Sequence, residues 1–352
     1  MPKSQSLQAT SDLCPDRPTA ASRVHLLMCT NALYFQHMSV CLTSLLINNP
    51  SLFFDIVVVR RTGEELDEDK LRRSLARFLN YSLSFRVFTF PADPLLPLNP
   101  DAHYTLDNWT RLWIENFFPG DIDRVLYLDS DIVVVGSVAA LWCADLDGAL
   151  LGAIDIPGSL QGVAQLGMCA EDGYFNSGVL LIDLKQWRES HALNTVLQYV
   201  EAYAERLIDL DQDALNACFH NRTKRLGYRW NATWSFYREP VSIPLPASEI
   251  ARVRREARII HFNGNSKPWN YLCDHPRKAE YDKYLRMTEW RDFVPEDRTA
   301  VNWLRKRISA ILPEKAKTLL KHAVRLMISP AVRLMISPAV RLMISKASPA
   351  KV

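Results

Sequence analysis

Two aspartates one residue apart interrupt an apolar run, "RVLYLDSDIVVVGSV" at 124–138. The Val, Leu and Ile residues on both sides are typical of a buried β-strand. Because residues i and i+2 of a strand point to the same side, Asp129 and Asp131 are expected to face one spot. Two buried carboxylates are costly unless a positive charge meets them. The pair therefore indicates either a Mg²⁺ or Mn²⁺ site, or a turn cap or partner for a buried arginine.

A second segment offers a third ligand. In "RIIHFNGNSKPW" at 258–269, His261 directly follows an apolar strand, and an imidazole ligand favours Mn²⁺ over Mg²⁺. The loop after it contains Gly264 and Lys267, which supply backbone N–H donors and a cation. These are the groups that bind a phosphate.

Two further polar clusters border apolar segments. In "YFNSGVLLIDLKQW", Asn176 is expected in a polar turn before a strand, and in "LDQDALNACF", Asp211 and Gln212 begin a helix. Aspartate is a favoured N-cap, which would explain one carboxylate without any chemistry. Capping does not explain the whole set of clusters.

The elements that position these residues alternate between strand and helix. Residues 24–29, 53–59 and 84–90 read as strands with amphipathic helices between them, and 108–118 reads as a helix. This alternation predicts an α/β fold with a parallel-type sheet and crossover connections over 23–290. In such sheets ligands bind at the carboxyl ends of the strands.

The two ends of the chain differ from this unit. Residues 1–22 read as a disordered leader, and 291–352 as a basic amphipathic tail in which AVRLMISP repeats begin at 323. From residue 301 onward the chain has eleven Lys or Arg and one acidic residue, although its net charge is only +3. We expect the tail to bind an anionic membrane surface, the alternative for the repeats being a duplicated, partly disordered extension. It lacks the interleaved aromatic residues of a nucleic-acid binder.

The compartment is inferred from cysteine usage and from segments that were not found. The seven cysteines are widely spaced, which favours free thiols in a reducing compartment. With neither a secretory signal nor a membrane span in the sequence, we expect a cytoplasmic protein held peripherally on the inner face of the membrane. The tripeptides "NRT", "NAT" and "NWT" match glycosylation acceptors but would not be modified there.

Taken together, "YLDSDIVV", "FNSGVLLIDL", "DQDALN" and "HFNGNSKPW" resemble glycosyltransferase family 8 over 24–269. This family of retaining nucleotide-sugar transferases includes bacterial lipopolysaccharide galactosyl- and glucosyltransferases and glycogenin. The resemblance implies a single GT-A domain with a mixed, mainly parallel sheet flanked by helices. It also implies a hexosyltransferase that moves galactose or glucose from a UDP-sugar to a glycan acceptor, such as lipopolysaccharide or a lipid-linked glycan.

The resemblance also implies roles for individual residues. Mn²⁺, with Mg²⁺ as the alternative, would be held against the donor diphosphate by Asp129, Asp131 and His261. The residues expected beside the donor sugar are Arg111, Asn176, Asp211 and Gln212. Those expected to bind the nucleotide-sugar are Cys29, Asn31, Tyr34, Asp129, Ser130, Asp131, Gly264 and Lys267. Asp155 is expected near the acceptor. Asn31 stands where the family usually has an acidic residue beside the uracil.

The mechanism that follows is transfer with retention. An uncharged amide such as Gln212 is a poor nucleophile, so we expect the acceptor to attack from the face that UDP leaves, with the metal and Lys267 stabilising the leaving group. Two other functions use the same residues: a metal-dependent nucleotide-sugar hydrolase, and a non-catalytic glycan-binding protein on a transferase fold.

Overall fold

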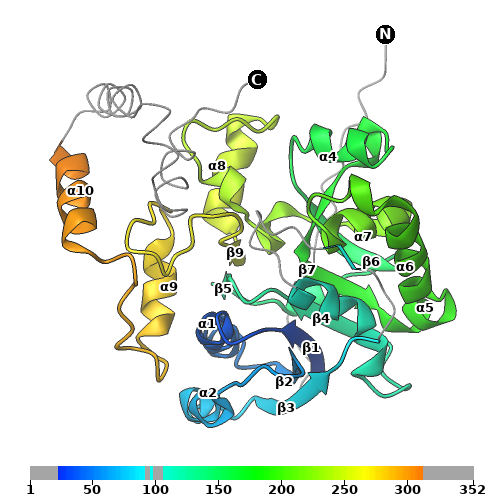
Figure 1. Ribbon diagram of the computed structural model, residues 1–352, viewed down its shortest axis with the longest axis horizontal. Coiled ribbons are helices and arrows are strands. Elements are labelled where there is room, and N and C mark those ends of the chain that lie inside the picture. The colour runs from blue at the N-terminus through cyan, green and yellow to red at the C-terminus, as the bar shows by residue number, and fades with distance from the viewer. Residues whose placement is uncertain (1–22, 92–95, 98–105, 312–352) are drawn as a thin grey trace. The chain divides into compact units, whose positions relative to one another are not determined.

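The computed structural model describes residues 23–91, 96–97 and 106–311 (Figure 1). These residues form two compact units. The first comprises 23–269 and 273–293, apart from the gaps, and the second comprises 270–272 and 294–311. The leader at 1–22 and the AVRLMISP repeats lie outside the described residues, and the predicted domain boundary at residue 290 stays a prediction.

A seven-stranded mixed sheet forms the centre of the first unit, in the order β3-β2-β1-β4-β7-β6-β8. Neighbouring strands are parallel except that β7 runs antiparallel to both β4 and β6. A separate antiparallel ribbon joins β5 to β9. The strands are β1 (Arg23–Cys29), β2 (Phe53–Arg61), β3 (Tyr81–Phe88), β4 (Arg124–Leu128), β5 (Ile132–Val134), β6 (Leu151–Asp155), β7 (Phe175–Asp183), β8 (Thr223–Arg225) and β9 (Ile259–His261). The predicted mixed, mainly parallel sheet is confirmed.

Helices of the first unit pack on both faces of this sheet, and α10 belongs to the second unit. The α-helices are α1 (Phe35–Ile47), α2 (Glu68–Leu75), α3 (Ala139–Trp142), α4 (Leu160–Gln165), α5 (Leu184–Glu189), α6 (Ala192–Tyr203), α7 (Asp211–Phe219), α8 (Ala247–Glu256), α9 (Lys278–Leu285) and α10 (Ala300–Ile311). The 3-10 helices are η2 (Leu106–Asn116), η3 (Ala170–Asp172), η4 (Ala204–Arg206), η5 (His220–Arg222), η6 (Tyr228–Trp230) and η7 (Trp234–Phe236).

The alternation of side chains along the central strands divides the core into two layers. In β1, Leu27 and Cys29 face a cluster built by η2, α5, α6 and α7. Leu26 and Met28 of the same strand face the opposite cluster, built by α1 and α2. A third cluster contains residues of β9, α8 and α9 (Figure 1). Because the second half of β1 is buried on both sides, residues 26–29 form a continuous apolar run.

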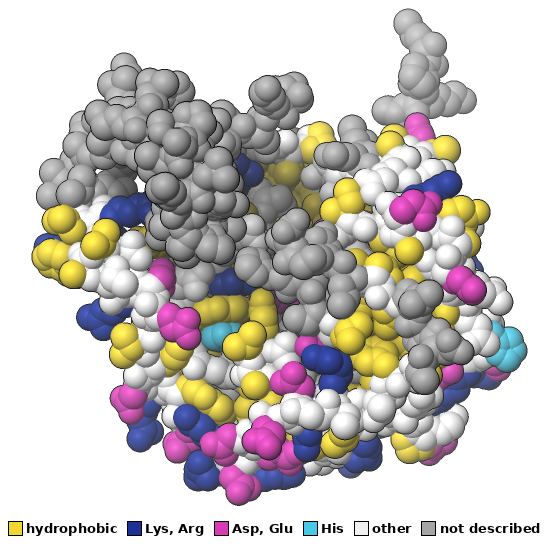
Figure 2. All heavy atoms as spheres, in the orientation of Figure 1, with side chains coloured by type: hydrophobic (Ala, Val, Ile, Leu, Met, Phe, Trp, Pro, Cys, Tyr) yellow, Lys and Arg dark blue, Asp and Glu magenta, His cyan; other side chains and the backbone are white. Residues whose placement is uncertain are grey.

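Helix α2 marks the solvated border of this unit. It buries Leu71 and Leu75, and the side chain of Asp67 caps its first turn by accepting from the Lys70 N–H at 2.9 Å. Its outer face carries both acidic and basic side chains, which lie intermingled at the lower edge of the surface in Figure 2. This mixture is typical of a helix that turns one face to water.

The run at 124–138 does not form the one continuous strand that was predicted. Strand β4 ends at Leu128 and pairs with β1 and β7, whereas β5 begins at Ile132 and pairs with β9. Asp129 and Asp131 therefore lie in the turn where the chain passes from the sheet to the ribbon. Their convergence comes from this change of partner and not from strand alternation.

One other local prediction was wrong. The Asn-Ser-Gly segment at 176–178 lies inside β7 and not in a turn before it. Its polar groups can be buried in a strand because distant side chains satisfy them, as described below. The helix predicted over 108–118 is present at 106–116 as a 3-10 helix, with Trp113 in a non-helical conformation.

The second unit contains α10 and the short segment at 270–272. The carboxylate of Asp297 accepts from the backbone N–H groups of Tyr271 and Leu272 at 2.6 and 3.0 Å. Lys306 on α10 donates to the Tyr271 carbonyl at 2.8 Å. Among the described residues, no helix combines the length and the apolar character needed to cross a membrane.

Candidate active site

Asp129, Asp131 and His261 converge on one point of the first unit. One ligand atom from each lies within 4.8 Å of the others. The β5–β9 ribbon causes this convergence, because Ile132 is the register partner of His261 and the Phe262 N–H donates to the Asp131 carbonyl at 3.0 Å. Two carboxylates and an imidazole form a donor set that suits a divalent cation.

Gly178 supplies the space for this group. Its carbonyl accepts from the Asp129 N–H at 2.9 Å, so β7 runs directly behind the turn. A Cβ atom on residue 178 would collide with the His261 ring and would lie 2.6 Å from Asp129 Oδ2. Glycine is therefore the residue that lets the two ligands approach β7, which gives the "FNSG" motif a steric reason.

Lys267 forms an ion pair with Asp131 from the loop after β9. Its ammonium contacts Asp131 Oδ2 and donates to the Phe262 carbonyl at 3.1 Å. Burial works against the Asp131 carboxylate, but the Lys267 ammonium and the adjacent His261 side chain outweigh it and hold the pKa of Asp131 well below its usual range. Asp131 is therefore ionised at neutral pH and available as a ligand.

Arg111 bridges two carboxylates from different elements. Its guanidinium lies 3.2 Å from Asp129 Oδ1 and 3.1 Å from Asp211 Oδ2. It also stacks over the Tyr127 ring at 4.4 Å, and the Tyr127 hydroxyl donates to Asp129 Oδ1 at 2.7 Å. This buried cation ties the metal-ligand turn to the start of α7.

The negative charge of Asp211 is only partly balanced by its neighbours. Its burial raises its pKa to about 7, although Arg111 opposes this shift, while Asp129 adds to it. Its Oδ2 has no hydrogen-bond partner in the part of the chain that the structure describes. One guanidinium therefore serves two acidic groups, and Asp211 carries a proton more readily than an ordinary aspartate.

Gln212 is fully hydrogen bonded. Its Oε1 accepts from Asn176 Nδ2 at 2.8 Å and from the Ser177 N–H at 3.0 Å. Its Nε2 donates to the Tyr174 hydroxyl at 3.0 Å, and that hydroxyl donates to Asp213. Both lone pairs of the amide oxygen face donors, which argues against Gln212 as a nucleophile and for a role in holding β7 against α7.

Asn231 belongs to the same network and was not identified from the sequence, where it appeared only as the first residue of an "NAT" match. It is 1% exposed. Its Nδ2 donates to Asn176 Oδ1 at 2.8 Å, and its Oδ1 lies 3.0 Å from His261 Nδ1. His261 and Asn176 lie 30 and 55 positions away from Asn231 in the sequence. No motif near Asn231 connects it with either residue, so only the fold could reveal these contacts.

The carboxyl end of β1 carries the residues predicted to contact the base. Cys29 is a buried thiol at the end of the strand. Asn31 accepts from the Tyr34 N–H at 3.1 Å and donates to Asp107 Oδ2 at 2.8 Å. Asp107 also pairs with Arg61, from the end of β2. The side chain of Asn31 is thus in direct contact with a carboxylate.

The loop after β9 is anchored by aromatic stacking. Gly264 adopts a positive φ of 81°, which glycine allows without strain. Trp269 stacks on His37 of α1, with ring centroids 3.4 Å apart and planes within 7°. Tyr34 packs edge-on against Trp269 at 5.5 Å. This stack fixes the end of the loop that carries Lys267.

Among the described residues, Asp155 and Ser130 make no side-chain hydrogen bond or ion pair with the other predicted site residues. Asp155 ends β6 and forms an ion pair with Arg225 at 3.3 Å, and burial raises its pKa. Ser130 is buried between the two aspartates, and its hydroxyl has no hydrogen-bond partner among the described residues. The structure thus assembles the other predicted residues around the ends of β1, β4, β7 and β9.

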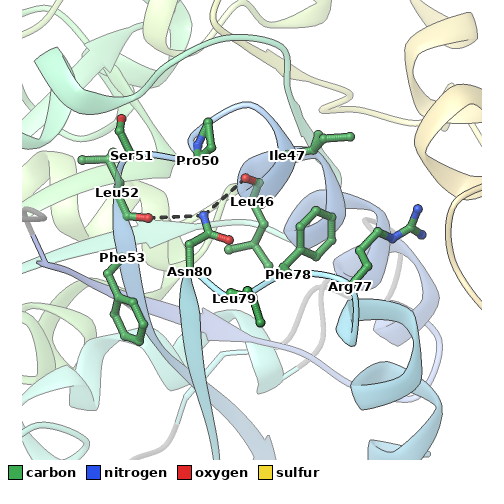
Figure 3. Close-up of a pocket in the computed structure, with 10 residues that line it drawn as sticks. All are labelled: Leu46, Ile47, Pro50, Ser51, Leu52, Phe53, Arg77, Phe78, Leu79 and Asn80. Carbon is green, nitrogen blue, oxygen red and sulfur yellow. Dashed lines mark hydrogen bonds between the residues drawn. The ribbon is translucent and has the colours of Figure 1, made fainter.

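A groove of about 510 Å³ lies elsewhere in the same unit (Figure 3). It is lined by the end of α1 and by the residues that precede β2 and β3. Asn80 closes its floor by donating to the carbonyls of Leu46 and Leu52 at 3.4 and 3.2 Å. Because it borders the amino ends of these strands, it is not part of the predicted site.

Comparison with known proteins agrees with this geometry. A general stress protein A of Bacillus subtilis is 26% identical over 76% of this chain and 94% of its own length. A lipopolysaccharide 1,2-glucosyltransferase of Escherichia coli is 24% identical over 80% of this chain and 83% of its own. The crystal structure of galactosyltransferase LgtC with donor and acceptor sugar analogues matches with a TM-score of 0.65 and 25% identity, covering 78% of this chain and 98% of that one.

The similarity to LgtC confirms the predicted GT-A type of fold. The model of the family described as glycosyl transferase family 8 matches residues 25–273, which contain the whole cluster described above. The chain therefore belongs to glycosyl transferase family 8 and is a hexosyltransferase, as its motifs predicted.

Proposed function

We propose that this protein transfers galactose or glucose from a UDP-sugar to a glycan acceptor, with retention of anomeric configuration. The observation that carries the proposal is the meeting of Asp129, Asp131 and His261 beside Lys267. The relatives named for lipopolysaccharide glucosyl transfer and for galactosyl transfer support a hexose donor and a lipopolysaccharide or other surface glycan as acceptor.

We propose Mn²⁺ as the cofactor, with Mg²⁺ as the alternative. The residues fit such an ion, since they offer two carboxylates and one imidazole nitrogen, and Gly178 leaves the ligand atoms room to converge. A bound divalent cation would neutralise the donor diphosphate and make it a better leaving group. Lys267 adds a second positive charge, and it can exchange its contact with Asp131 for one with phosphate.

The reaction that this geometry favours is attack from the face that the diphosphate leaves. The bond between the anomeric carbon and the diphosphate oxygen breaks, and its electrons stay on the diphosphate. The acceptor hydroxyl oxygen bonds to the anomeric carbon on the same face, and its proton passes to the departing phosphate oxygen. Support comes from Gln212, whose amide oxygen already accepts two hydrogen bonds. Arg111 and Asp211 are then left to orient the sugar hydroxyls.

A donor screen tests this proposal. The purified chain would be given a panel of nucleotide sugars with Mn²⁺, Mg²⁺ or EDTA, and UDP release would be measured with and without a truncated lipopolysaccharide acceptor. We expect metal-dependent release of UDP that requires the acceptor and is lost in Asp129→Ala. Equal release without acceptor would identify a hydrolase. Glycan binding without any release would identify a non-catalytic protein.

We further propose that the protein works on the cytoplasmic face of a membrane, held there by the residues after 293. Support comes from α10, on which Val301, Trp303 and Leu304 are exposed next to three basic residues at 305–307. Exposed apolar and basic side chains on one helix are the combination that binds anionic bilayers.

A further inference from the structure

The imidazole of His261 is buried and contacts polar groups through both ring nitrogens. It is 2% exposed. Its Nδ1 lies 3.0 Å from Asn231 Oδ1, while Nε2 faces Asp131 Oδ1 at 3.1 Å and Asp129 Oδ2 at 3.8 Å. Only a nitrogen without a hydrogen can bind a metal ion, so the tautomer of His261 decides whether this side chain can act as a ligand.

Backbone donors fix the direction of the hydrogen bonds that reach His261. The Gly178 N–H donates at 3.0 Å to one side-chain atom of Asn176, which must therefore be the oxygen. The atom of Asn231 that lies 2.8 Å from this oxygen must then be its NH₂ group. The other terminal atom of Asn231, which faces His261, is consequently an oxygen and can only accept.

A second backbone group fixes the same direction independently. The Ser177 N–H donates to one side-chain atom of Gln212 at 3.0 Å, which identifies that atom as the oxygen. Asn176 must then present its NH₂ group to Gln212, at 2.8 Å, and its oxygen to Asn231. The two anchors agree, so the orientation of all three amides follows from main-chain chemistry and not from a choice made at any one side chain.

We propose that Asn231 is a positioning residue that fixes the tautomer of His261, an inference that rests on the proposed metal-assisted function. Asn231 Oδ1 accepts the hydrogen on His261 Nδ1. In the neutral ring, Nε2 is then left with a lone pair directed at the carboxylates of Asp129 and Asp131. Three electron-rich atoms that face one another favour a cation between them, which is the arrangement of a metal site with its supporting hydrogen bond.

Two substitutions separate this role from simple packing. Asn231→Leu removes the acceptor while keeping a similar volume. Asn231→Asp keeps an acceptor for the Nδ1 hydrogen but cannot donate to Asn176. Asn49→Leu serves as a matched control, because Asn49 is also 1% exposed and makes two hydrogen bonds, to the Leu45 carbonyl and the Val138 N–H. It belongs to none of the contacts described for the site.

The first readout needs no metal. Proteins labelled with ¹⁵N-histidine would be compared by long-range ¹H–¹⁵N NMR, with the His261 signals assigned by their loss in His261→Gln. We expect Nδ1 to carry a hydrogen in the wild type, in Asn231→Asp and in Asn49→Leu, and a mixture or the neutral Nε2–H form in Asn231→Leu. An unchanged Nδ1 hydrogen in Asn231→Leu, or a wild type whose Nδ1 carries no hydrogen, would overturn the proposal.

The second readout is Mn²⁺ affinity, measured from the electron paramagnetic resonance signal of free Mn²⁺. We expect Asn231→Leu to bind about 10- to 100-fold more weakly than the wild type, and the Asp and control variants to bind within a few-fold of it. Equal weakening in Asn231→Asp and Asn231→Leu would contradict the role of the acceptor. If Asn231→Leu does not fold, the proposal is tested with Asn231→Asp alone. Loss of Mn²⁺ affinity in Asn231→Asp, or loss of its Nδ1 hydrogen on His261, would then overturn the proposal. A wild type that binds no Mn²⁺ would count against the proposed function. The NMR measurement of the His261 tautomer would still test the role of Asn231 in that case.

Discussion

At the scale of single residues, the three carboxylates of Asp129, Asp131 and Asp211 share two basic side chains, those of Arg111 and Lys267. Arg111 lies between Asp129 and Asp211, and Lys267 is taken up by Asp131. Burial then raises the pKa of Asp211 to about 7, while it cannot do the same for Asp131, which has Lys267 and His261 beside it. Neighbouring aspartates thus differ in charge state because their partners differ, and this difference has measurable consequences.

Asp211 should make the stability of the protein depend on pH. An aspartate in the unfolded chain releases its proton near pH 3.9, whereas Asp211 in the folded chain does so near 7. Between these values the folded state binds more protons, so the free energy of unfolding falls as the pH rises. We expect the free energy of unfolding of the wild type to fall by roughly 2.5 kcal/mol between pH 5 and 7.5, a loss that Asp211→Asn does not show. Urea denaturation of both proteins at the two pH values measures this, and parallel losses would contradict it.

Gly178 should be intolerant of even one added methyl group. In Gly178→Ala, the new Cβ would meet the His261 ring and Asp129 Oδ2, which have no room to move because both are held by hydrogen bonds. We expect Mn²⁺ binding and transfer activity to fall by roughly a hundredfold or more, while the circular dichroism spectrum stays that of a folded protein. Gly120→Ala is the control, since nothing lies within 4 Å of a Cβ there. Wild-type Mn²⁺ affinity in Gly178→Ala would refute the steric argument.

At the scale of elements, the site depends on which strands and helices meet. Apolar periodicity was enough to predict β1, β2 and α1, since each is a long run with one pattern. It could not show that the run at 124–138 changes partner from the sheet to the β5–β9 ribbon, because pairing with a strand some 130 residues away leaves no local signal. The ends of elements were predicted within a few residues.

The same limit explains the residues that were misplaced or missed. Asn176 reads as a turn residue, yet it is buried in β7 because Gln212 and Asn231 satisfy its amide. Asn231 itself has no neighbours in the sequence that suggest chemistry. Motifs therefore pointed to the candidate ligands and to the candidates beside the sugar, whereas the hydrogen bonds that orient these side chains became visible only when α7, β7 and η6 were brought together.

The stack between α1 and the Lys267 loop should control donor binding. His37 is buried against Trp269, and its Nδ1 lies 2.7 Å from the Tyr281 hydroxyl of α9. Burial lowers the pKa of His37 to about 3, so the stack stays neutral throughout the working pH range. We expect His37→Ala to loosen the loop and to reduce kcat/KM for the donor by roughly ten- to a hundredfold, with His37→Phe closer to the wild type because a ring is retained.

Steady-state kinetics with the donor as the varied substrate would measure this effect. Since the pKa of His37 lies far below neutrality, the ratio of variant to wild-type kcat/KM should not change between pH 6 and 8. A ratio that does change over this interval, or His37→Phe as impaired as His37→Ala, would contradict the stacking role.

At the scale of the whole molecule, charge is unevenly distributed along the chain. The last 52 residues hold eleven basic residues and one acidic residue, so the rest of the chain is acidic. Within the described part of this basic region, Val301, Trp303 and Leu304 are 74, 48 and 53% exposed. Moving exposed apolar side chains from water into a bilayer surface is favourable, because their apolar area is removed from water. Positive charges beside them add attraction to anionic lipids. The same arrangement would keep the enzyme near a lipid-linked acceptor.

The prediction is that α10 takes part in membrane binding through these three side chains. The triple variant Val301→Ser, Trp303→Ser and Leu304→Ser should partition onto phosphatidylglycerol vesicles at least tenfold less than the wild type, since each buried side chain contributes on the order of 1 kcal/mol. Leu79→Ser is the control, because Leu79 is 93% exposed but lies before β3 in the first unit. Wild-type binding should weaken with salt and be absent on neutral vesicles, as expected for surface charges. Co-sedimentation measures all of these, and a triple variant that binds as tightly as the wild type would exclude α10 as the contact.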